Sequence, residues 1–417
     1  MTDMTLAPRR RPLWPLFIVP GLVLIAAIAW SGFWFYAASQ VDVMADAWRA
    51  REAKSGRVYD CEKRSVAGFP FRLEIRCDGA SVTLIAQTAG QPPHPPVTAK
   101  LGEILAVAQI YDPKLVIAEF TAPAKIFEQG AQQPSFVVNW SKGRSSIVGL
   151  PAIPQRADIE FDDPTIERLD GTMQVPLANA KHVELHGRIA QGSPSDHPDI
   201  ESVLEINQGS IQGLHPLLAQ PFDAGIRAMV TGLKDFAPKP WPQRFREIQA
   251  AGGHIEIMQS RVQQGDLIAV AAGTLSLNPN GKLDGELQMT VAGIEKVIPA
   301  LGIEKMLEDG VPQATLDRVA PGVKTQDLNN LFGALDRAIP GLGKVVKQNA
   351  NVGVAAGINA LGKEAELEGK KARAFPLRFV DGAAFFGPLK VGDVPPLFLR
   401  SLVISHSREA SSIFGSD

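Results

Sequence analysis

The chain is poor in cysteine, tyrosine and net charge. Its 417 residues include 2 Cys, 3 Tyr and 7 His, and 42 Lys and Arg stand against 44 Asp and Glu. So few cysteines exclude a disulfide-rich miniprotein. A net charge of -2 gives no general attraction to nucleic acid, so we expect no nucleic-acid partner. The hydrophobic content of 45% excludes a disordered chain and predicts a substantial core.

Catalytic and cofactor motifs are also missing. The order HVELH at 182–186 differs from the HExxH of zinc hydrolases, and GLGK at 341–344 lacks the upstream glycine and the following Ser or Thr of a phosphate loop. No G-x-S-x-G motif of a serine hydrolase occurs. We therefore expect no catalytic residues, no metal site and no cofactor. An enzyme is only the third of three functional possibilities.

A charge-free stretch runs from Pro12 to Gln40. At about 1.5 Å per residue, an apolar helix over 13–36 is long enough to cross a hydrocarbon core of about 30 Å. Trp14 near one end, and Trp34 and Tyr36 near the other, are expected at the two membrane interfaces. The sequence thus predicts a tail at 1–12, a transmembrane helix at 13–36 and a juxtamembrane helix at 37–55.

Charges beside this span predict its orientation. Arg9, Arg10 and Arg11 precede it directly, whereas the next charge after it is Asp42. The positive-inside rule then puts the N-terminus in the cytoplasm and exports the rest of the chain. A signal peptide cleaved near 37–39, Ala-Ala-Ser, is the competing interpretation.

The two cysteines, Cys61 and Cys77, lie just beyond the span. Residues 69–77 alternate between apolar and polar side chains, which predicts a half-buried strand. If residues 57–65 pair with this strand through a turn near 67–68, the cysteines stand opposite each other at a separation that suits a disulfide. Export favours this disulfide, and two unrelated buried thiols are the alternative.

Further along, strand-like runs alternate with turn signals such as Asp-Gly at 170–171 and Asn-Pro-Asn-Gly at 278–281. The runs are 104–108, 115–120, 136–140, 157–161, 173–177, 181–189, 253–258, 266–271, 274–277 and 283–291. We predict an α+β fold, in which an antiparallel, curved β-meander sheet with short packed helices follows one N-terminal transmembrane helix.

Two regions have helical patterns. A helical stretch is expected at about 213–251, and apolar residues at i, i+3, i+4 and i+7 predict short helices over 294–361. The β-rich domain is expected to cover 56–405, followed by a tail at 406–417. A Phe-Pro-apolar-Arg pattern occurs at 69–72 and again at 375–378, each time with Asp-Gly-Ala further on, and predicts two equivalent strands.

Four motifs, in this order, carry a family resemblance: GFPFR at 68–72, WPQRFREIQAAGG at 241–253, GTLSLNPNGKLDGELQMTVAG at 273–293 and DGAAFFGPLKVG at 381–392. Together they resemble the bacterial envelope family catalogued as domain of unknown function 2125, over nearly the whole exported part. The motif residues singled out are Gly68, Phe69, Pro70, Phe71, Arg72, Gly252, Gly253, Asp381 and Gly382. The resemblance supplies no catalytic residues. The run at 273–286 is also similar to strands of AsmA-like envelope proteins, whose sheets are associated with phospholipid transport.

The anchor and the resemblance together imply a single-pass protein of the cell inner membrane with its C-terminal domain in the periplasm. Our first hypothesis is a non-enzymatic protein that binds or conducts lipid or another apolar ligand in a concave sheet, so membrane lipid is the expected partner. An ordinary filled core is the alternative to such a binding surface. The second hypothesis is a scaffold or interaction subunit of an envelope complex, which would bind partner proteins through a sheet edge or through 294–361. No sequence feature sets an oligomeric state.

Overall fold

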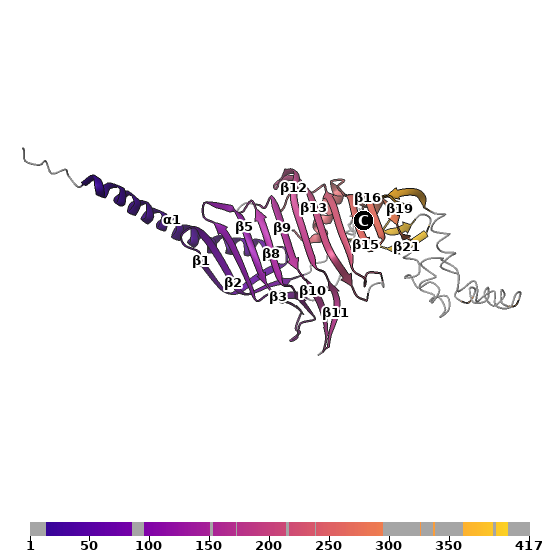
Figure 1. The fold of residues 1–417 in the computed structure, drawn as a ribbon, viewed down its shortest axis with the longest axis horizontal. Coiled ribbons are helices and arrows are strands. Elements are labelled where there is room, and N and C mark those ends of the chain that lie inside the picture. Colours follow the sequence, from indigo (N-terminus) through magenta and orange to yellow (C-terminus); the bar gives the residue numbers. More distant parts are fainter. Residues whose placement is uncertain are drawn as a thin grey trace, which may run out of the picture.

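The computed structural model describes residues 14–85, 96–150, 153–171, 173–213, 217–237, 239–294, 362–386 and 389–398, and positions 326 and 337. These residues form two helices and one antiparallel sheet of 21 strands (Figure 1). The helices are α1 (Trp14–Ala53) and α2 (Trp241–Ala250). The predicted α+β fold with its N-terminal helix is thereby confirmed. The helices predicted over 294–361 lie outside the described residues, apart from the two single positions.

The sheet has a long leaf, a short leaf and an extension. The long leaf contains β1 (Arg57–Ala67), β2 (Arg72–Leu84), β4 (Glu103–Gln109), β5 (Asp112–Thr121), β8 (Lys142–Val148), β9 (Arg156–Asp162), β12 (His182–Ser193) and β13 (Asp196–Ile211). The short leaf contains β3 (Val97–Lys100), β6 (Ala124–Glu128), β7 (Phe136–Asn139), β10 (Thr165–Asp170) and β11 (Met173–Asn179). The extension contains β14 (Phe222–Val230), β15 (His254–Gln264), β16 (Leu267–Leu277), β17 (Leu283–Ala292), β18 (Lys363–Leu367), β19 (Lys370–Val380), β20 (Ala383–Phe386) and β21 (Leu389–Asp393).

The two leaves are halves of the same bent strands. Only two residues separate β5 from β6, namely Ala122 and Pro123, and the pairs β3–β4, β7–β8, β9–β10 and β11–β12 are joined in the same way. Both leaves also keep one strand order, from β2 to β13. The chain therefore forms one sheet folded along a crease that crosses its strands, and Figure 1 shows β3, β10 and β11 below the longer strands.

The most deeply buried apolar side chains gather at the two ends of the sheet. At the first end, Trp34 and Val41 of α1 pack with Leu73 and Ile110. At the other end the buried side chains include Leu233, Ile248 of α2, Ile268, Val291, Phe375 and Phe398. The helices thus cover the ends of the sheet, where α1 packs on β1 and α2 on β16.

The predicted helical stretch at 213–251 is wrong in its first part. Residues 222–230 form β14, and only 241–250 are helical. In β14 the side chains of Ala224, Ile226, Ala228 and Val230 occupy one face. Two of these four are alanines, which give little strand signal by themselves, so the pairing with β13 and β15 decides the structure.

The equivalence of the two Phe-Pro segments is also wrong. Phe69 and Pro70 lie in the turn between β1 and β2, whereas Phe375 and Pro376 lie inside β19, opposite Met289 and Gln288. Likewise, Asp-Gly-Ala at 78–80 lies within β2, but Asp-Gly at 381–382 forms the turn between β19 and β20. Similar short sequences adopt different structures here because their cross-strand partners differ.

Candidate functional site

One face of the long leaf and of the first two strands of the extension, β14 and β15, is apolar from strand to strand, as the register shows. Phe161 stands opposite Val183, Leu185 opposite Ile159, and Leu204 opposite both Leu185 and Ile226. We call the following side chains the apolar face: Ala118, Phe120, Ile147, Ile159, Phe161, Val183, Leu185, Ile200, Leu204, Ile226, Ala228, Ile255 and Ile257. On this face no charged side chain occurs at the paired positions of β8, β9 and β14. The same holds for segment 183–189 of β12 and segment 200–206 of β13.

The side chains of the apolar face are only partly covered. Twelve of the thirteen are half-buried and the remaining one, Leu185, is 45% exposed. In contrast, the apolar contacts at the two ends of the sheet include Trp34 at 5% and Phe375 at 1% exposure. Large side chains in a filled core are close-packed and almost fully buried. The middle of the sheet therefore presents apolar surface that the described chain does not fully cover.

Aromatic residues mark the crease beside this face. Trp140, between β7 and β8, donates a hydrogen bond of 2.9 Å from Nε1 to the carbonyl oxygen of Phe120, and its ring lies 5.1 Å from that of Phe161. Gly143 leaves room for these rings, because a Cβ there would lie 2.7 Å from Trp140 Nε1. The indole thus lies on the apolar face, at the bend between the two leaves.

The opposite face of the same strands is charged. His182 contacts Asp162 at 2.6 Å and Glu184 at 2.7 Å, and His186 contacts Asp158 and Glu184, both at 2.9 Å. Hydrogen bonding to Glu184, and then to Asp162, raises the pKa of His182 above its usual value; hydrogen bonding to Asp158 does the same to the pKa of His186. Conversely, the two histidines lower the pKa of Glu184.

A shallow cavity of about 220 Å³ opens on this charged face, lined by His186, Arg188, Glu201 and Arg227 among others. Its charges are mutually paired, since Glu201 accepts a hydrogen bond of 2.6 Å from Arg188 and lies 3.6 Å from Arg227. In the described part of the chain, no group of three His, Cys, Asp or Glu side chains is arranged to hold a metal ion. The HVELH segment therefore contributes a salt-bridge network on a strand.

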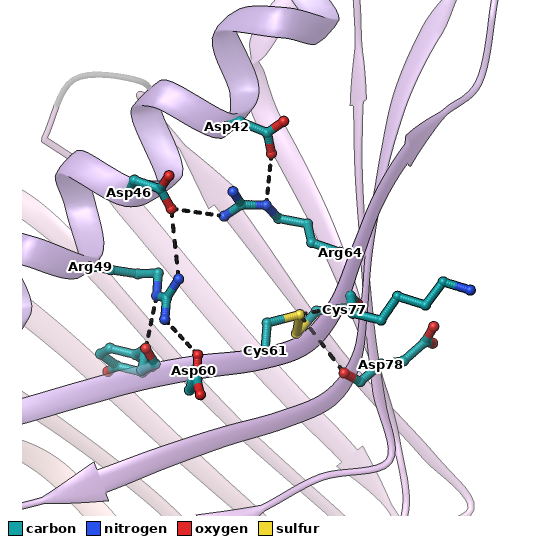
Figure 2. Close-up of a disulfide and its surroundings, with 10 residues drawn as sticks. Asp42, Asp46, Arg49, Asp60, Cys61, Arg64, Cys77 and Asp78 are labelled. Atoms are coloured by element: carbon teal, nitrogen blue, oxygen red, sulfur yellow. Dashed lines mark hydrogen bonds and ion pairs between the residues drawn. A yellow bond between two sulfur atoms is a disulfide. The ribbon is translucent and has the colours of Figure 1, made fainter.

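Helix α1 joins the sheet to the long apolar segment. It is long and apolar enough to cross a membrane, although a signal sequence has the same properties. It continues through the predicted juxtamembrane segment as far as Ala53. Its polar end is tied to β1, because Asp42 contacts Arg64 at 2.7 Å and Arg49 contacts Asp60 at 2.6 Å (Figure 2). Helix α1 and the sheet thus form one packed unit at this end.

Cys61 and Cys77 form the predicted disulfide, with a Cα–Cα distance of 5.7 Å. The predicted register, however, is wrong: Cys61 pairs with Ala80, and Cys77 pairs with Arg64. The turn lies at 68–71 rather than near 67–68, and β1 and β2 bend where the ladder omits the pair Glu62 and Gly79. Gly79 has φ of 63°, and this bend, visible in Figure 2, brings the two sulfur atoms together.

The residues predicted to lie at the two membrane interfaces differ in how exposed they are. Trp14 and Tyr36 are exposed on α1, whereas Trp34 is 5% exposed and donates a hydrogen bond of 2.9 Å to the carbonyl oxygen of Arg72. Trp34 therefore packs in the protein core instead of facing lipid. The three arginines at 9–11 lie outside the described residues.

The remaining motif residues lie in turns and close contacts. Gly68 has φ of 99° in the β1–β2 turn, and Gly252 has φ of 66° after α2. At Gly253 a Cβ would lie 2.4 Å from the carbonyl oxygen of Thr231. Asp381 accepts a hydrogen bond of 2.8 Å from Lys282 in the β19–β20 turn, beside Gly382. These positions explain the motif glycines by backbone geometry.

Sequence reasoning did not single out any residue of the apolar face. The signal was present, because each of these strands has alternate apolar residues, but only the register shows that the alternate positions of neighbouring strands coincide. Sequence reasoning also missed Trp30, whose Nε1 donates a hydrogen bond of 2.8 Å to the carbonyl oxygen of Pro70.

A comparison with protein-family models matches residues 34–395 to the family described as "Uncharacterized protein conserved in bacteria (DUF2125)". The chain belongs to this family. The match begins at the buried Trp34 and ends beyond β21, so it covers the hairpin, the folded sheet and the extension. No curated protein matches the chain. The family resemblance is thereby confirmed, and the similarity to AsmA-like proteins stays a prediction.

Proposed function

We propose that this DUF2125 protein is anchored in the cell inner membrane and holds an acyl chain of a lipid, or a similar apolar ligand, along the apolar face in the periplasm. One observation carries this proposal: half-buried apolar side chains continue across neighbouring strands without an intervening charge. Each methylene that such a ligand buries contributes about 0.8 kcal/mol. An extended apolar chain would therefore gain from lying there.

The dimensions support this kind of ligand. Neighbouring strands lie about 4.8 Å apart, so the six spacings from β5 to β15 span about 29 Å along the direction of the crease. A bilayer core of about 30 Å contains two layers of acyl chains. The apolar face is therefore longer than a single acyl chain. The long hydrogen-bonded sheet leads from the membrane helix toward the extension, so a ligand on the face is guided away from the membrane.

The test compares two neighbouring positions of β13. Ser202 lies on the apolar face, opposite Gly187 and Ala228, whereas Val203 lies on the charged face, opposite His186 and Arg227. Ser202→Glu places a carboxylate among apolar side chains, and Val203→Glu places the same group between two basic residues. We expect lipid to copurify with the wild type and the Val203→Glu variant, and not with Ser202→Glu.

Native mass spectrometry after gentle detergent extraction measures this directly. Lipid held only around α1 is retained equally by both variants, so the difference between them reports the sheet. Equal melting temperatures show that both variants fold. Absence of copurified lipid from the wild type, or equal lipid in both variants, would contradict the proposal.

The alternative, a scaffold in an envelope complex, makes a different prediction. One of its two partner surfaces, 294–361, lies outside the described residues. Crosslinking in native membranes should then capture a stoichiometric protein partner, and Ser202→Glu should leave that partner bound. Loss of lipid without loss of a partner favours the first proposal.

A further inference from the structure

The turn between β1 and β2 carries exposed aromatic side chains beside the membrane helix. Phe69 is 52% exposed and Phe71 is 63% exposed. Tyr111, in the β4–β5 turn, is 67% exposed, and the neighbouring Ile110 donates a backbone hydrogen bond of 3.0 Å to the carbonyl oxygen of Phe71. We call Phe69, Phe71 and Tyr111 the aromatic tip.

The aromatic tip is continuous with the apolar surface of α1. The ring of Phe69 lies 5.5 Å from Trp34 and 6.0 Å from Phe35, and the ring of Phe71 lies 6.3 Å from Trp30. Phe35 is itself exposed on the helix. The tip and the helix therefore form one apolar surface, and whatever surrounds this part of α1 also meets the tip.

The height of the tip along α1 places it at the membrane boundary. Trp30 and Trp34 lie about 24 Å and 30 Å above Trp14, at about 1.5 Å per residue, and a hydrocarbon core is about 30 Å thick. Arg72, next to Phe71, pairs with Glu74, and the first ion pair between α1 and the sheet above the tip joins Asp42 to Arg64, about 12 Å beyond Trp34 on the same scale. At the level of Trp30 and Trp34 the tip carries aromatic rings, which favour the interface between hydrocarbon and headgroups.

Four backbone carbonyl groups in and beside the turn have hydrogen-bond partners within the protein, as a bilayer environment requires. The carbonyl oxygens of Gly68, Pro70, Phe71 and Arg72 all accept hydrogen bonds within the protein, from Arg72 N, Trp30 Nε1, Ile110 N and Trp34 Nε1. An irregular turn enters a bilayer only when its polar backbone groups have such partners, because each unpaired group costs several kcal/mol there.

From these observations we infer that the aromatic tip is embedded in the outer leaflet of the bilayer that α1 crosses, and that it seats the first strands of the sheet in that leaflet. The inference rests on the membrane anchoring of the proposed function. It adds the place at which lipid enters the protein from the leaflet. Arg72, exposed beside the tip and paired with Glu74 at 2.6 Å, then lies at the level of the lipid phosphates. Lipid would then pass from the leaflet toward the apolar face without crossing open water.

Spin labels on the full-length protein test this in vesicles of phosphatidylethanolamine and phosphatidylglycerol. Phe71→Cys and Tyr111→Cys carry labels at the tip, and Lys63→Cys, exposed on β1 of the same hairpin, is the matched control. One label per chain shows that Cys61 and Cys77 remain paired. We expect the two tip labels to collide with oxygen more than with a water-soluble nickel chelate, and the control label to show the reverse.

Collision of both tip labels with nickel would place the tip in water and overturn the inference. Shielding of both from oxygen as well as nickel would indicate contact with a second copy of the chain and would also overturn it. If the tip labels report water while Ser202→Glu still loses lipid, the entry point is wrong and the proposed function stands. If the tip labels report the bilayer while no lipid copurifies with the wild type, the tip is placed correctly and the proposed ligand is wrong.

Discussion

Trp34 of α1 donates a hydrogen bond from its indole Nε1 to the carbonyl oxygen of Arg72, the first residue of β2, over 2.9 Å. The same indole is 5% exposed and packs with Val41, Leu73 and Ile110. One side chain therefore fixes α1 to the sheet both by packing and by a directed hydrogen bond. Two substitutions at Trp34 can separate the contribution of packing from that of the hydrogen bond.

Trp34→Phe keeps an aromatic ring and removes the donor, so we expect a loss of about 1–3 kcal/mol in the free energy of unfolding, because the Arg72 carbonyl loses its partner. Trp34→Ala removes the packing too and should cost about 3–5 kcal/mol. Urea unfolding of the full chain in detergent measures both. Tyr36→Phe, at an exposed position of the same helix, is the control and should change little. Equal stability of Trp34→Phe and the wild type would show that the hydrogen bond contributes nothing.

The disulfide predicts the state of both thiols. In protein taken directly from cells without reductant, denaturation should expose no thiol to a labelling reagent, because Cys61 and Cys77 are paired. The Cys61→Ser/Cys77→Ser double variant should lose about 3 kcal/mol, the chain-entropy value for a loop of this length. Two reactive thiols per chain would contradict the oxidising location.

The histidine network predicts how stability depends on pH. The raised pKa values of His182 and His186 add stability that is complete below their usual value of 6.5 and is lost as the pH rises through the folded-state values. The lowered pKa of Glu184 adds stability above its usual value of 4.5 and loses it in more acidic solution. The network therefore stabilises most between these two values.

We expect the free energy of unfolding to fall between about pH 6 and pH 8, and the His182→Gln/His186→Gln double variant to show a smaller fall. Because these side chains are partly exposed, solvent screening keeps the effect modest. Urea titrations at the two pH values measure it. His197→Gln, at an exposed histidine outside this network, is the matched control. A double variant with the wild-type pH slope would refute the assignment.

Two glycines at positions of the apolar face should respond differently to alanine. At Gly143 a Cβ would lie 2.7 Å from Trp140 Nε1 and 2.9 Å from Phe161 Cε1, whereas at Gly187 the nearest atom would be the Ala157 carbonyl oxygen at 3.7 Å. Gly143→Ala should therefore lower stability by about 1–3 kcal/mol through overpacking, and Gly187→Ala should be tolerated. Thermal unfolding of the two variants checks this. Equal melting temperatures would mean that the aromatic cluster at the crease moves freely.

Membrane topology is tested by fusions. If the N-terminus is cytoplasmic, a reporter that is active only in the periplasm works after Asp417 and fails before Met1. An anchored chain retains its N-terminal segment, so mass spectrometry of the purified protein should detect residues before Trp34. The reverse fusion pattern would overturn the orientation, and a chain that begins near 38–40 would establish a cleaved signal peptide.

Local structure follows from the amino-acid sequence wherever the hydrophobic pattern is periodic and strong. The charge-free run before Asp42 specifies the long apolar helix, and strict alternation at 283–291 specifies β17, because burial on one face requires that period. Two cysteines in the first hairpin were enough to predict their disulfide. Their true register follows from the turn at 68–71, and the bend beside Gly79 lies in neither cysteine's local pattern.

How the strands combine depends on tertiary structure. Nothing in Phe161, Leu185 or Leu204 alone places them on a common surface; the hydrogen-bonded register between β9, β12 and β13 does. Trp34 shows the same dependence, because an aromatic residue near the end of an apolar helix looks like an interface anchor until the hairpin turn packs against it. Local propensity acts over a few residues, whereas these contacts join parts of the chain that are far apart in sequence, so their positions follow from packing.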